Sequence, residues 1–72
     1  MYTHFILYLS RPGQPTQSTF YITPTPISWI AARDRLQQAG VLTGYKAGSY
    51  SDGWMLSIDT KGVTPSNPTA LP

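Results

Sequence analysis

The chain has 72 residues with no cysteine, five Lys or Arg against three acidic residues, and a formal net charge of +2. This length predicts a single domain with a modest core, and the lack of cysteine excludes a disulfide framework and thiolate chemistry. No apolar run approaches the roughly 20 residues that a membrane-spanning helix needs. The N-terminus shows no basic region followed by an apolar run and a cleavage site. We therefore expect a cytoplasmic protein without a membrane contact.

Residues 2–10 are dense in aromatic and β-branched side chains, which predicts a first strand. Pro and Gly in residues 11–16 predict a turn, and residues 17–23 predict a second strand that forms an antiparallel hairpin with the first. In the first strand, the set expected to face a helix is Thr3, Phe5, Leu7 and Leu9, and the set expected to face away is Tyr2, His4, Ile6 and Tyr8. In the second strand, we expect Phe20 and Ile22 to face the core and Thr19, Tyr21 and Thr23 to face away.

Residues 26–40 are the segment with helical spacing of apolar residues. Thr25 predicts the N-cap and Pro26 the first helical position. Gly40 predicts the end, because glycine adopts the left-handed cap at least cost. The side expected to pack on a sheet carries Trp29, Ala32, Leu36 and Ala39.

The opposite side of this helix carries Ile27 and Ile30. Two interpretations stay open. Either both side chains pack under a loop or staple the helix start, or Ile30 belongs to an exposed surface for a partner. The second interpretation predicts a secondary contact patch made of Ile30, Arg33, Asp34 and Gln37.

The chain after Gly40 predicts two further strands separated by a loop. Residues 41–47 predict a short strand, and residues 48–53 predict a polar, glycine-rich loop with Tyr50 at its tip. Residues 54–60 predict the last strand, and the Pro-rich residues 63–72 predict a flexible tail after a domain that spans residues 1–62. In the last strand, Trp54, Leu56 and Ile58 are expected to face the helix, and Met55, Ser57 and Asp59 to face away.

Together these elements predict an α+β domain of order ββαββ, with a four-stranded, mainly antiparallel sheet and one helix packed on one face. An uncovered sheet face is ordinary when it is polar. Five Tyr, two Phe and two Trp are too many for a core of this size, so the uncovered face is expected to be aromatic. The predicted partner-binding surface consists of this face and the adjoining loop: Tyr2, His4, Tyr8, Tyr21, Lys46, Tyr50 and Met55.

Patterns for catalysis or metal binding are weak in this chain. His4 is the sole histidine, and Asp34, Asp52 and Asp59 are scattered, whereas a zinc site needs about four ligands. The sequence contains neither a GxSxG turn nor a phosphate-binding glycine loop with a following Lys. We therefore expect no catalytic residue, no metal and no cofactor, and a protein that is not an enzyme.

Low charge combined with surface aromatics favours a binding protein whose partner is a larger protein or protein complex. A homodimer through the open sheet face is a second arrangement, because a short domain gains stability by association. The alternative function is a nucleic-acid-binding module, with tyrosines that stack on bases beside Arg11, Arg35 and Lys46. Protein contact needs fewer assumptions, since the RNP1 pattern and the second helix of RNA-recognition domains are missing.

In its short length, its ββαββ pattern and its lack of catalytic residues, the chain resembles small phage- or plasmid-encoded accessory proteins, including anti-CRISPR inhibitors. The similarity is one of size and style, and no motif carries functional residues over. It implies an inhibitor that masks part of a larger host complex.

Overall fold

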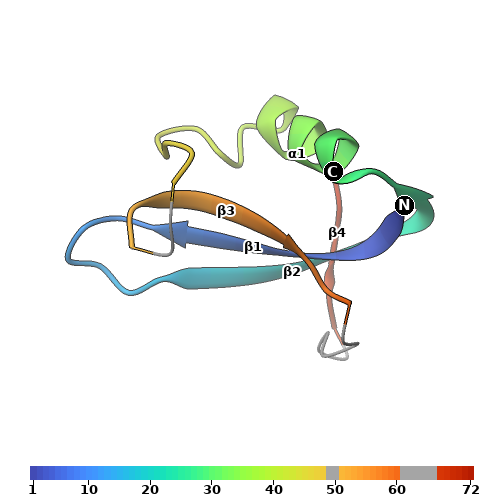
Figure 1. Ribbon diagram of the computed structural model, residues 1–72, viewed down its shortest axis with the longest axis horizontal. Helices are drawn as coiled ribbons and strands as arrows, with labels where there is room; N and C mark the ends of the chain where they lie inside the picture. The colour runs from blue at the N-terminus through green and yellow to red at the C-terminus, as the bar shows by residue number, and fades with distance from the viewer. Residues whose placement is uncertain (49–50, 61–66) are drawn as a thin grey trace.

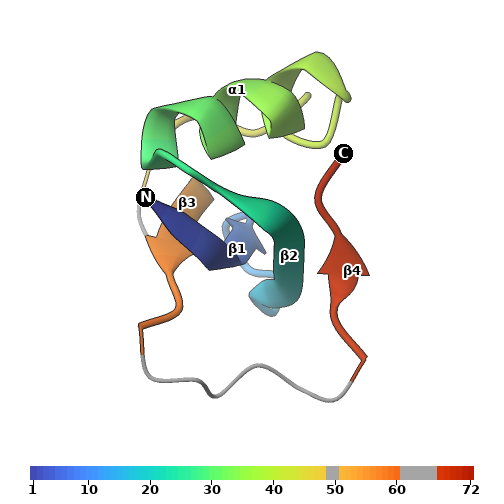
Figure 2. The same cartoon turned by 90° about the vertical axis from the view of Figure 1, so that its right-hand side faces the viewer.

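A computed structural model of the chain describes residues 1–48, 51–60 and 67–72. These residues form a four-stranded mixed sheet of order β3-β1-β2-β4, with the helix on one side of it (Figures 1 and 2). The predicted α+β class is therefore confirmed, whereas the predicted strand boundaries differ. The elements are β1 (Tyr2–Ser10), β2 (Gln17–Ile27), α1 (Trp29–Gln38), β3 (Gly53–Ile58) and β4 (Thr69–Ala70).

The β1–β2 hairpin fixes which side chains reach the core. Its turn is closed by the Gln14 N–H, which donates to the Arg11 carbonyl at 3.0 Å. The strands pair antiparallel with Phe5 opposite Tyr21, so these two side chains lie on the same face of the sheet. Tyr21 is accordingly buried, at 6% exposed, on the side that α1 covers.

The predicted faces of β2 are therefore wrong. The sequence predicts Phe20 and Ile22 in the core, but in the structure Tyr21 is a member of the core and Thr23 is buried. The prediction placed the two more hydrophobic side chains inward. The register is set instead by the number of residues in the turn. A turn that is longer or shorter by one residue moves every side chain of the second strand to the other face.

The core lies between the sheet and α1. Phe5, Leu7 and Leu36 are fully buried at its centre, and Leu56 of β3 completes it from the neighbouring strand. These positions confirm the predicted inward faces of the first and last strands. The remaining buried members of this cluster are Tyr21, Ile27, Ala32 and Leu42.

Helix α1 begins later than its sequence predicts. Ser28 is the N-cap, and its side-chain oxygen accepts a hydrogen bond from the Ala31 N–H at 3.0 Å. The prediction of a start at Thr25 and Pro26 is wrong, because both residues lie in β2. A Ser cap that satisfies a free N–H of the first turn stabilises a start there. Ile27 is consequently the last residue of β2, and it is buried in the core.

The helix ends where glycine predicts. Gly40 has φ +79, its N–H donates to the Gln37 carbonyl at 3.1 Å, and the Val41 N–H donates to the Leu36 carbonyl at 3.1 Å. This pair of bonds is the Schellman arrangement, which satisfies carbonyls left free at a helix end. Ala39 is the exposed C-cap residue, so its predicted place on the sheet-facing side is wrong.

The strand predicted over residues 41–47 is also wrong. Consecutive turns replace it, with the Thr43 N–H bonded to the Gly40 carbonyl and the Tyr45 N–H to the Leu42 carbonyl. An isolated bridge between Ala47 and Trp54 joins the end of this segment to β3. Glycines with positive φ at both 40 and 44 bend the backbone out of extended geometry, while buried Leu42 anchors the turns to the core.

The outer edge of β3 is closed by hydrogen bonds. The Trp54 N–H donates to the Lys46 carbonyl at 2.9 Å, and the Gly48 N–H donates to the Trp54 carbonyl at 3.2 Å. The Leu56 carbonyl accepts from Trp29 Nε1 at 2.7 Å. Unpaired backbone groups on an edge strand can form hydrogen bonds with a strand of another chain. On β3, the turn segment and the Trp29 indole bond to these groups instead.

Strand β4 forms the opposite edge of the sheet. It pairs parallel with β2 through Thr69 and Ala70, and the Leu71 N–H donates to the Ile22 carbonyl at 2.9 Å. The Leu71 side chain packs against the core. The sequence predicts a flexible tail over residues 63–72. Residues 63–66 of that tail lie outside the described residues, whereas Thr69 and Ala70 belong to the sheet and make it mixed.

We predict that Trp29→Phe lowers the free energy of unfolding by about 1–2 kcal/mol, because the Leu56 carbonyl loses its donor while the ring is largely kept. Urea denaturation followed by circular dichroism measures this loss. Trp54→Phe is the matched control: the two indoles lie 6.4 Å apart between ring centroids, so both variants shrink the same cluster. An equal loss in the two variants would show that ring size, and not the hydrogen bond, is responsible.

Candidate functional site

The register places a second apolar surface on the side of the sheet opposite α1. Ile6 of β1 lies between Phe20 of β2 and Ser57 of β3. Side chains alternate along strands, so the residues two positions away on each strand share this side. We call this surface the far face, and it comprises His4, Ile6, Tyr8, Ser18, Phe20, Ile22, Met55, Ser57 and Ala70.

The middle of the far face is hydrophobic. Ile6 is only 8% exposed although it lies outside the core cluster on the helix side. Tyr8, Phe20, Ile22 and Met55 around it are half-buried. In the part of the chain that the structure describes, no helix packs on this side (Figure 2). The sheet therefore has an apolar centre on both sides, and α1 covers one of them.

The structure assembles part of the predicted partner-binding set. His4, Tyr8 and Met55 lie on the far face, as the sequence predicts. Tyr21 does not, because its side chain is in the core. Tyr2 is 41% exposed at the start of β1, beyond an irregularity in the register between Tyr2 and His4.

Two further members of that set come from the loop before β3. Tyr50 lies outside the described residues. Lys46 lies beside β3 and forms an ion pair with Asp52, with Nζ and Oδ2 2.7 Å apart. The hydrogen bond and charge of Asp52 raise the pKa of Lys46. The Lys46 side chain is 71% exposed, so this ion pair lies in solvent and contributes little stability.

Sequence reasoning missed Phe20 and Ile22 as far-face residues. We expected them in the core because they are hydrophobic. The number of residues in the hairpin turn is the signal that contradicts this expectation. Leu9 lies opposite Gln17, so odd-numbered residues of both strands share the helix side. Counting residues outward from the turn at residues 11–16 would have placed Tyr21 on the helix side, and Phe20 and Ile22 on the far face.

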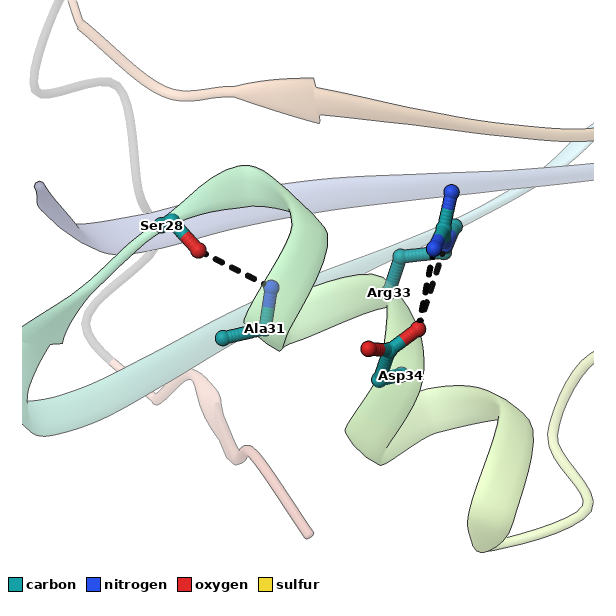
Figure 3. Close-up of polar contacts among 4 residues, drawn as sticks. All are labelled: Ser28, Ala31, Arg33 and Asp34. Atoms are coloured by element: carbon teal, nitrogen blue, oxygen red, sulfur yellow. Dashed lines mark hydrogen bonds and ion pairs between the residues drawn. The ribbon is translucent and has the colours of Figure 1, made fainter.

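The predicted secondary patch lies on the exposed side of α1. Ile30 is 58% exposed, and Arg33 bonds through Nη2 to Asp34 Oδ1 at 3.0 Å (Figure 3). The Arg33 guanidinium also lies 5.6 Å from the centre of the Trp29 ring. Gln37 is exposed on the following turn. An ion pair between two half-exposed side chains contributes little stability. The four residues of this patch are accessible on α1, and their role as a contact patch stays a prediction.

A hollow of about 270 Å³ lies at the end of the sheet where β1 starts and β3 finishes. His4 and Asp59 are among its lining residues. His4 Nδ1 lies 2.7 Å from the Thr3 hydroxyl oxygen, and the Asp59 N–H donates to the His4 carbonyl at 3.0 Å. These contacts hold His4 at one end of the far face.

Within residues 1–48, 51–60 and 67–72, no three His, Cys, Asp or Glu side chains gather as a metal site would require. None of the helical residues described forms a segment long and apolar enough to cross a membrane. No protein-family model, curated protein or solved structure matches this chain.

The placement of Tyr21 has a measurable consequence at high pH. Burial raises the pKa of the Tyr21 phenol above its ordinary value of 10.0. Below that pH the phenol is protonated in both the folded and the unfolded chain. As the pH rises further, the unfolded chain ionises first, so this residue's contribution to stability is lost.

We therefore predict that the free energy of unfolding of the wild type falls as the pH rises above about 10, and that Tyr21→Phe reduces this fall. Chemical denaturation at a series of alkaline pH values measures both slopes. Absorbance of tyrosinate near 295 nm gives the titration directly. If Tyr21→Phe leaves the slope and the late-ionising absorbance unchanged, the phenol is solvated and its place in the core is wrong.

Proposed function

We propose that this protein is a small, non-catalytic binding protein that contacts a larger protein through its far face. The observation that carries this proposal is the hydrophobic centre of that face. Ile6 lies directly opposite Phe20 on β2, and Met55 lies diagonally from it on β3, beside Ser57 and opposite Tyr8. The three form a diagonal apolar strip across three adjacent strands. A strip of this kind on a side that α1 leaves uncovered is typical of a protein-contact surface.

The geometry suits recognition of a protein surface. Specific interfaces bury roughly 800 Å² on each partner, an area that one face of a small sheet supplies. Tyr8 is the aromatic residue of the central strand, and Met55 lies opposite it on β3. Aromatic and Met side chains are enriched at interfaces because they bury large area with adaptable shape.

Inhibition is the mode of action that we propose. A 72-residue chain that occupies a surface of a larger host complex blocks whatever that surface binds, without chemistry of its own. The size and style shared with phage- and plasmid-encoded accessory proteins support this mode. They do not identify the complex.

The nucleic-acid alternative has weaker support. It relies on Tyr2, Tyr8 and Tyr21 for stacking, and on Arg11, Arg35 and Lys46 for phosphate contact. Tyr21 is buried and Lys46 is paired with Asp52, so one of the three tyrosines is removed and one of the three cations is paired within the chain. Base stacking needs exposed aromatic planes beside available cations.

We predict that a far-face variant, Phe20→Ser combined with Met55→Ser, loses capture of its protein partner by about tenfold or more, since hot-spot truncations commonly cost at least 2 kcal/mol. Immobilised wild-type protein and variant are incubated with lysate of the native cell, and bound proteins are quantified by mass spectrometry. Ile30→Ser is the matched control, because it removes an exposed apolar residue from the helix side.

Each result bears on the proposal. Proteins that depend on the far face but not on Ile30 support it, provided that circular dichroism shows both variants folded. Equal recovery on wild type and far-face variant contradicts it. Sedimentation velocity of the pure protein tests self-association. A wild-type dimer that the far-face variant abolishes would show that the far face binds a second copy of the chain and not a larger partner. Capture that disappears after nuclease treatment favours the nucleic-acid alternative.

A further inference from the structure

A hollow of about 260 Å³ lies at the turn end of the β1–β2 hairpin. Leu9 and Gln17 line it, and they are a cross-strand pair on the helix side of the sheet. Its other lining residues are Ser10, Arg11, Gln14, Pro15 and Tyr45. The hollow thus lies at the hairpin end, away from the centre of the far face around Ile6, and what it binds is independent of the proposed function.

Arg11 is held in place by an aromatic ring. Its guanidinium carbon lies 4.3 Å from the centre of the Tyr45 ring, a stacking contact that orients the planar group. A Cβ at Gly44 would lie 3.3 Å from Arg11 Nη2, so the turn that carries Tyr45 approaches the arginine closely. A guanidinium that lies over a ring face carries its N–H groups in its own plane, where they can donate to a ligand.

Within residues 1–48, 51–60 and 67–72, no carboxylate forms an ion pair with this arginine. Asp34 is paired with Arg33 and Asp52 with Lys46, and Asp59 lines the hollow at the other end of the sheet. Among the ion pairs of the described residues, none includes Arg11. A preoriented guanidinium without an acidic partner is the group that recognises a carboxylate through two parallel hydrogen bonds.

The rest of the lining defines the ligand further. The side chains of Gln14 and Gln17 add neutral hydrogen-bond donors, and Leu9 and Pro15 add an apolar wall. Arg11 is the cation of the lining, so the hollow carries a single positive charge. That charge balances a monoanion, whereas one charge of a phosphate dianion would stay unbalanced.

We propose that this hollow binds a carboxylate, with Arg11 as the charged donor, Tyr45 as its support and the two glutamines as flanking donors. The same carboxylate chemistry has two sources: a free monocarboxylic acid, or an Asp or Glu side chain of a protein. The hollow recognises the carboxylate in either case, and the source decides whether contacts beyond the carboxylate add affinity.

The test is a titration of the full chain near neutral pH with propionate and with acetyl-glutamate N-methylamide, at constant ionic strength. Nuclear magnetic resonance follows the Arg11 Nε–H and the Gln14 and Gln17 side-chain amides. We expect saturable shifts at millimolar ligand. Arg11→Gln should weaken binding by about tenfold or more, and Arg11→Lys, which keeps the charge but loses the planar fork, by a smaller factor. Tyr45→Leu should weaken it about threefold through loss of the stack.

Arg35→Gln is the matched control, because it removes an exposed arginine that is not part of the lining; it should leave both affinities unchanged. Equal binding of the two probes supports the proposal with a free acid as source, and binding of the glutamyl probe alone supports it with a protein side chain as source. The proposal is overturned if neither probe gives saturable shifts, if Arg11→Gln binds like the wild type, or if inorganic phosphate binds more tightly than either probe.

Discussion

The hairpin register of β1 and β2 is the constraint on which the rest of the structure depends. With Phe5 opposite Tyr21, the helix side of the sheet receives one aromatic ring from each strand, and the other side receives Ile6 and Phe20. A shift by one residue would exchange every one of these side chains. The turn that sets this register also carries Arg11, so the same few residues place the core, the far face and the hollow at the hairpin end.

Given this register, α1 serves as the cover of one face only. Leu36 and Ala32 bury the helix against the sheet, and Trp29 ties it to β3 by donating to the Leu56 carbonyl. That bond has two effects. It satisfies a carbonyl on an edge strand, and it positions the helix beside the Trp54 ring, whose centroid lies 6.4 Å from that of Trp29. Because α1 packs on this side of the sheet, it does not cover the apolar strip around Ile6 on the other side.

Both edges of the sheet are occupied by short segments of the chain. The turns after α1 bond to Trp54 on β3, and β4 pairs with Tyr21 and Ile22 on β2. Because part of the backbone on both edge strands is already hydrogen-bonded, we expect a partner to contact side chains on the faces of the sheet and not its edges. The proposed protein contact and the proposed carboxylate site then use different sides of the same sheet, the far face and the hairpin end around Arg11.

The sequence by itself determined the α+β class, the hairpin, the glycine at the helix end and the inward faces of β1 and β3, because these follow from local alternation and backbone preference. His4, Tyr8 and Met55 were placed on the uncovered side for the same reason. Tertiary structure decided the rest. The face on which Tyr21 lies depends on the number of residues in the turn. The strand at residues 69–70 forms because one edge of β2 has no other strand paired with it. The contact of Arg11 with Tyr45 joins segments that are far apart in the chain. Local patterns do not encode pairing between distant segments, since that pairing is chosen by which apolar surfaces the whole chain buries together.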